Sequence, residues 1–60
     1  MPVIEVFMWE GRSPERKKKI IQGITDVFVS DGVEASSVTI ILHDIRKENW
    51  GTAGKRADEK

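Results

Sequence analysis

Hydrophobic positions along the chain change from a strand-like pattern to a helix-like pattern and back. Segment 2–9 is rich in β-branched and aromatic residues, which predicts a strand. Within 14–30, apolar residues recur at helical spacing, which predicts an amphipathic helix. Those on the expected sheet-facing stripe are Ile20, Ile24, Val27 and Phe28. A second strand is expected over 37–45, and a strand–helix–strand order predicts parallel strands joined by one crossover.

Local signals mark both ends of the helix and the segment after the second strand. Ser13 is a preferred N-cap residue, and Pro14 follows it at the first helical position. Gly32 can adopt the left-handed conformation that ends a helix. A charged turn is expected at 46–48, and the glycines within 50–54 predict a bend or a small hairpin. The expected fold class is therefore α/β (α+β), a β-α-β protomer with one helix on one face and a short C-terminal hairpin.

Both faces of the first strand are apolar. By alternation, one face carries Ile4, Val6 and Met8, and the other carries Val3, Phe7 and Trp9. The second strand is also apolar on both faces, but a single helix covers only one side of a sheet. Because parallel sheets are normally covered on both sides, we expect further copies of this chain to cover the second face.

Length and composition also favour association of several copies of the chain. The 60 residues are enough for one small domain, expected to span 1–60. A chain of this size buries only about 60% of its unfolded surface, so a monomer is marginally stable. There is no cysteine and only one histidine, His43, so disulfides, iron–sulfur clusters, thiolate zinc sites and a histidine-rich metal cage are excluded. Self-association is then the expected source of additional burial.

Charge and the length of the apolar runs argue against nucleic acid and membranes as partners. Ten basic and ten acidic residues cancel, whereas a nucleic-acid-binding domain normally has a basic excess. Apolar runs such as Phe7–Trp9 are far too short to span a membrane. We therefore expect a cytoplasmic protein with neither nucleic acid nor membrane as its partner. The basic run Arg16–Lys19 leaves nucleic-acid binding as a weaker alternative.

Three residues have chemistry suited to a site for a small acid. If Met1 is removed, Pro2 becomes an N-terminal secondary amine, and desolvation lowers the pKa of such an amine from an ordinary value of about 7.7–8.0. A neutral nitrogen base near the operating pH suits general base catalysis. Arg12, at the strand-to-helix turn, can bind a carboxylate with two hydrogen bonds. Trp50 is suited either to the wall of an apolar pocket or to a subunit contact.

Together these features resemble the 4-oxalocrotonate tautomerase family over essentially the whole chain. The similar features are Met1-Pro2 before a short strand, the Gly11-Arg12-Ser13 turn, the Ser37-Val38 strand entry and the Trp50-Gly51 segment. The resemblance implies an isomerase that needs no cofactor or metal. Its substrate would be a small carboxylic acid of the 2-hydroxymuconate type, converted from enol to keto form. It also implies a homohexamer, arranged as a trimer of dimers.

The resemblance also implies roles for individual residues. Pro2 would be the general base, Arg12 would bind a substrate carboxylate, often across a subunit boundary, and Trp50 would wall the pocket. Thr39 occupies the substrate-binding position where well-known members have a second arginine, so a monoacid substrate is one expectation. A non-catalytic oligomeric or ligand-binding protein with the same fold is the alternative. If Met1 remains attached, the nitrogen of Pro2 is an amide and cannot accept a proton.

Overall fold

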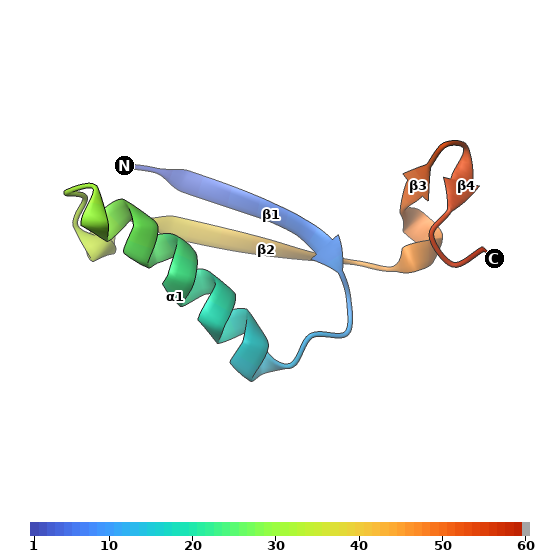
Figure 1. Cartoon of the computed structure of the whole chain (residues 1–60), viewed down its shortest axis with the longest axis horizontal. Helices are drawn as coiled ribbons and strands as arrows, with labels where there is room; N and C mark the ends of the chain where they lie inside the picture. The colour runs from blue at the N-terminus through green and yellow to red at the C-terminus, as the bar shows by residue number, and fades with distance from the viewer. Residues whose placement is uncertain (60) are drawn as a thin grey trace.

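A computed structural model describes residues 1–59 and contains the expected strand–helix–strand unit followed by a hairpin (Figure 1). The elements are β1 (Val3–Trp9), α1 (Pro14–Ser30), the 3-10 turn η1 (Ala35–Ser37), β2 (Thr39–Ile45), the 3-10 turn η2 (Lys47–Asn49), β3 (Gly51–Thr52) and β4 (Lys55–Arg56). β1 and β2 pair in parallel, and β3 and β4 form the antiparallel hairpin. The predicted α/β (α+β) class is confirmed.

The local signals place the ends of α1 correctly. The hydroxyl of Ser13 accepts a hydrogen bond from the Arg16 backbone N–H at 3.3 Å, as expected of an N-cap. Gly32 has a φ of +92°, the left-handed conformation that stops the helix. The second strand begins at Thr39 rather than at Ser37. The reason is local, because the Val38 N–H bonds back to the Ala35 carbonyl at 3.1 Å and closes η1.

The α1 helix lies against one side of the two-stranded sheet (Figure 1). On that side Met8 is buried, and the Lys17 ammonium pairs with the Asp44 carboxylate of β2, which links helix to sheet. The prediction that Val27 belongs to the packed stripe was wrong, since its side chain is 66% exposed. Ile24 and Phe28 are half-buried, so the packed stripe is narrower than the apolar pattern suggests.

The other side of the sheet is open within the part of the chain that the structure describes. Phe7 is 57% exposed and Val3 is 54% exposed, and Trp9 and Ile41 are also exposed. The hairpin of β3 and β4 does not cover this face, because it extends beyond the end of the sheet (Figure 1). The second face is thus apolar, as alternation predicts, and it is exposed in the single chain.

A single chain has too little core for an independent unit. Its accessible surface is 4828 Å², whereas a compact monomer of its mass exposes about 4000 Å². The radius of gyration is 14.4 Å, against about 10 Å for a compact chain of this length. Met8, 8% exposed, is the only buried residue among 1–59.

Among residues 1–59, no helix combines the length and the apolar character needed to cross a membrane.

Candidate active site

Pro2 and Thr39 lie together at the start of the sheet. Pro2 directly precedes β1 and is half-buried, and the Thr39 N–H donates to its carbonyl oxygen at 3.1 Å. This bond starts the parallel register in which Val3 lies opposite Thr39. Met1 precedes Pro2 and is 92% exposed. The sheet therefore places Thr39, an uncharged residue, beside the residue predicted to be the base.

Arg12 and Trp50 lie together at the opposite end. Gly11 has a φ of +115°, a conformation that strains any residue with a Cβ, and it turns the chain so that Arg12 folds back. The Nη1 atom of Arg12 donates to the Trp9 carbonyl at 3.2 Å. The Trp50 ring meets the Trp9 ring edge-on, with centroids 5.9 Å apart and planes at 75°. Trp9 thus joins the two predicted residues into one group.

The four predicted site residues consequently divide into two pairs within a single chain. The seven residues of β1 separate the Pro2 end from the Arg12 end, which is about 23 Å at the usual rise of a strand. Figure 1 shows the N-terminus at one end of the sheet and the β3–β4 hairpin beyond the other. A small acid cannot contact Pro2 and Arg12 of the same chain across that distance.

Trp9 and Lys47 are members of the second group that the sequence analysis did not predict. The Lys47 ammonium lies over the Trp9 ring, 4.6 Å from its centroid. Only their positions in the sequence relative to Arg12 and Trp50 could have pointed to these two residues. Trp9 ends the first strand just before the Gly11-Arg12 turn, and Lys47 precedes Trp50 by three positions in a tight turn.

Arg46, by contrast, is held by a carboxylate in the same region. Its Nη1 atom lies 3.6 Å from Glu48 Oε1, and both side chains are mostly exposed. Arg46 also follows the end of β2 whereas Thr39 begins that strand, so within one chain Arg46 is a poor substitute for the missing charge at Thr39.

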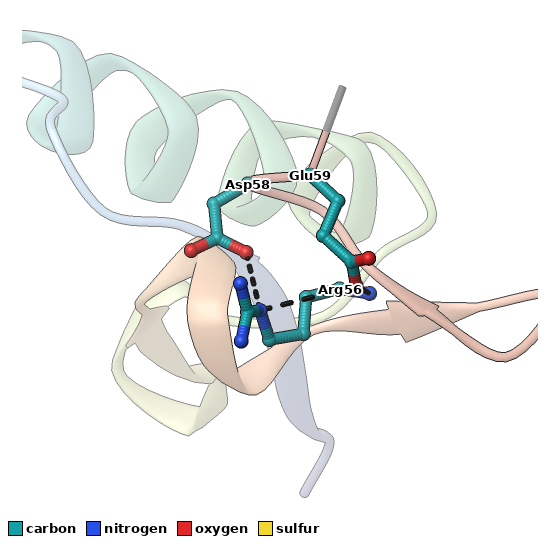
Figure 2. A network of polar contacts seen from close by, with 3 residues as sticks. All are labelled: Arg56, Asp58 and Glu59. Carbon is teal, nitrogen blue, oxygen red and sulfur yellow. Dashed lines mark hydrogen bonds and ion pairs between the residues drawn. The ribbon is translucent and has the colours of Figure 1, made fainter.

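The hairpin end is held by a second group of polar contacts. The Arg56 side chain donates to Asp58 at 2.9 Å, and its backbone N–H donates to the Glu59 carboxylate at 2.6 Å. Figure 2 shows the two carboxylates on either side of the Arg56 side chain. The Ala57 N–H then donates to the Trp50 carbonyl at 2.8 Å. These contacts hold the end of the hairpin against the backbone of Trp50.

On the open face of the sheet, His43 forms a contact group separate from the predicted site residues. Its Nε2 atom lies 3.0 Å from a Glu5 carboxylate oxygen. Its ring stacks on Phe7, with centroids 4.4 Å apart and planes at 7°. His43 is thus engaged by its neighbours on the sheet, in keeping with a structural role on this face.

The family model that describes tautomerase enzymes matches residues 2–60. The chain belongs to this tautomerase family. A 2-hydroxymuconate tautomerase from Comamonas testosteroni is 43% identical over 60 residues, covering 98% of this chain and 95% of its own length. Tautomerases are isomerases, and the chain is an isomerase of this family.

Solved structures agree with the family assignment. One from a study of the 4-oxalocrotonate tautomerase isozymes of Methylibium petroleiphilum is 33% identical, with a TM-score of 0.87 over 93% of this chain and 92% of its own. A heterohexamer 4-oxalocrotonate tautomerase from Chloroflexus aurantiacus is 23% identical, with a TM-score of 0.89 over 98% and 97% of the two chains, and it shows the same fold. The predicted resemblance to 4-oxalocrotonate tautomerases is confirmed.

Proposed function

We propose that this tautomerase converts a 2-hydroxydienoate-like acid of the 2-hydroxymuconate type to its keto isomer, with Pro2 as the general base. The observation that carries the proposal is the position of Pro2, half-buried at the start of β1 and next to the exposed Met1. The family match also begins at Pro2, and the Comamonas relative is named for 2-hydroxymuconate. Removal of Met1 gives this position a free secondary amine.

The reaction needs one proton to be moved between two substrate atoms. The Pro2 nitrogen takes the proton from the 2-hydroxyl group and delivers it to C3 or C5, which leaves a carbonyl at C2. Arg12 binds the carboxylate with its guanidinium, and Trp50 excludes water from the reacting end. Thr39 lies beside Pro2 and offers a hydroxyl instead of a charge.

The same proposal requires several chains. Pro2 and Arg12 of one chain are separated by the length of β1, so a complete site combines Pro2 of one copy with Arg12 and Trp50 of another. The exposed apolar sheet face and the small core supply a physical reason for association. We propose a homohexamer arranged as a trimer of dimers, and this is supported by the solved neighbour of the same fold that is described as a heterohexamer.

The proposed activity is tested by following the ultraviolet absorbance of 2-hydroxymuconate during ketonisation. The protein is first shown by intact mass to lack Met1, and a form that retains Met1 is the matched control. We expect turnover well above the uncatalysed rate in the first form and none in the second, because an amide nitrogen accepts no proton. A Met1-free protein without turnover, but with bound acid in equilibrium dialysis, would instead identify a ligand-binding protein.

Assembly through the open face gives a separate prediction. Replacing Phe7 by glutamate puts a second carboxylate near Glu5 on the exposed apolar face, and burying this charge in an interface costs several kcal/mol. We expect Phe7→Glu to lose the hexamer in sedimentation velocity, leaving smaller or unfolded species. The control Gln22→Glu adds the same charge on the exposed side of α1 and should retain the hexamer. A Phe7→Glu protein with the mass of the parent assembly would show that this face is not an interface.

A further inference from the structure

Within β1 and β2, Glu5 and His43 are the only ionisable side chains on the open face of the sheet. The register places His43 opposite Phe7, and alternation puts Glu5 on the same face as Phe7. Asp44 lies on the other face, where it pairs with Lys17 of α1. The remaining strand residues on the open face are uncharged, namely Val3, Phe7, Trp9, Thr39, Ile41 and Ile45. One acid and one base thus lie in an otherwise uncharged, mostly apolar surface.

These two residues pair with each other. The His43 Nε2 atom lies 3.0 Å from a Glu5 carboxylate oxygen, and the His43 ring stacks on Phe7. We call Glu5 and His43 the open-face pair. When His43 is protonated the pair has no net charge, because each chain supplies both the acid and the base.

The open face is suited to contact with another copy of this chain. Phe7 is 57% exposed there, and Met8 is the only buried residue among 1–59, so covering the face provides burial that the single chain lacks. A second copy has the same open-face pair. With both histidines protonated, neither copy brings a net charge to the interface.

In the single chain, water reaches both members of the open-face pair. The His43 side chain is 36% exposed and the Glu5 side chain is 56% exposed. A copy that covers the face removes this water. If His43 is then uncharged, the Glu5 carboxylate is buried without a counter-charge, which is strongly unfavourable. Histidine gains and loses its charge between about pH 5 and pH 8, so the ambient pH decides which state is present.

We propose that assembly through the open face takes up a proton at each open-face pair, so that the assembly weakens as the pH rises above neutrality. The inference rests on the proposed assembly of several chains. Its sign follows from the charges, since the protonated pair is neutral and the deprotonated pair leaves one buried negative charge per chain. Because a complete site combines Pro2 of one copy with Arg12 of another, activity is lost together with assembly.

The test is sedimentation velocity on a dilution series of the parent protein at about pH 6 and about pH 8.5. Urea is added at one concentration, chosen so that the parent is half assembled near neutral pH. Uptake of one proton per chain changes the association constant by up to about tenfold per pH unit for each chain. We therefore expect the protein concentration at half assembly to be at least about tenfold higher at the upper pH.

Glu5→Gln is the decisive variant, because it keeps the His43 ring and its stacking on Phe7. Its open face is uncharged at the upper pH and carries an unpaired positive charge at the lower pH. We expect the pH dependence to reverse, with weaker assembly at about pH 6. The control is the double variant Glu5→Gln with His43→Gln, which should assemble equally at both pH values. It retains the N-terminal amine, which titrates in the same range.

Three results would overturn the inference. They are a parent protein whose state of assembly is the same at both pH values, a Glu5→Gln protein with the parent's pH dependence, and a double variant with that dependence. The last result would assign the effect to the N-terminal amine or to another group outside the open-face pair. Failure of the proposed activity has a different signature, namely no ketonisation by a Met1-free parent protein whose assembly still weakens as the pH rises.

Discussion

Replacing Pro2 by alanine in Met1-free protein is expected to lower kcat for ketonisation of 2-hydroxymuconate by about 10²–10⁴-fold, the usual contribution of a general base. The pyrrolidine ring holds the nitrogen at one position relative to the start of β1. Alanine leaves a primary amine that rotates about its bond to Cα, so the base is no longer held toward the substrate. The measurement is steady-state kinetics on protein whose N-terminus has been verified by intact mass.

The chain offers a matched control for this substitution. Pro14 occupies the first helical position of α1, far from the start of the sheet, and alanine is well accepted there. Pro14→Ala should keep kcat within about twofold of the parent, as expected for a surface change outside the site. A Pro2→Ala protein with the parent's kcat would exclude Pro2 as the base, whatever the effect on KM.

Replacing Arg12 by glutamine is expected to lower kcat/KM by about 30-fold to 10³-fold, because truncating one partner of a desolvated charge pair costs about 2–4 kcal/mol. Much of the loss should be in KM, since the guanidinium binds the carboxylate in both ground state and transition state. The Arg12 side chain also reaches back to the Trp9 carbonyl, so circular dichroism is measured to verify that the fold is retained.

The control for Arg12 is Arg16→Gln, which removes the same charge from the exposed side of α1. Its kcat/KM should stay within about twofold of the parent. Equal losses in the two variants would mean that Arg12 contributes only to the general positive field and does not bind the substrate.

Much of the fold could be predicted because local rules act strongly in this chain. Alternation in β1, the Ser13 cap and the Gly32 stop each depend on residues close in sequence, and each is present in the structure. The exposure of Val27 could not be predicted in the same way. It lies about 100° around the helix from Phe28, and only the position of the sheet decides which of the two is covered.

The site residues themselves stay predictions. Their individual chemistry pointed to Pro2, Arg12 and Trp50, and resemblance to the family added Thr39, but their division between the two ends of β1 follows from strand length and register. The contact between Trp9 and Lys47 joins residues 38 positions apart. It depends on η2 turning the chain back beside the end of β1, and short 3-10 turns of this kind have no strong sequence signal.

The central claim is that different chains supply the Pro2 and Arg12 of one site, and subunit mixing tests it most directly. The nearly inactive Pro2→Ala and Arg12→Gln proteins are unfolded together and refolded as one mixture. Some sites then combine the intact Pro2 of an Arg12→Gln chain with the intact Arg12 of a Pro2→Ala chain. For random mixing in equal amounts, about a quarter of the parent's activity should return. A mixture no more active than the sum of its two components would contradict the claim.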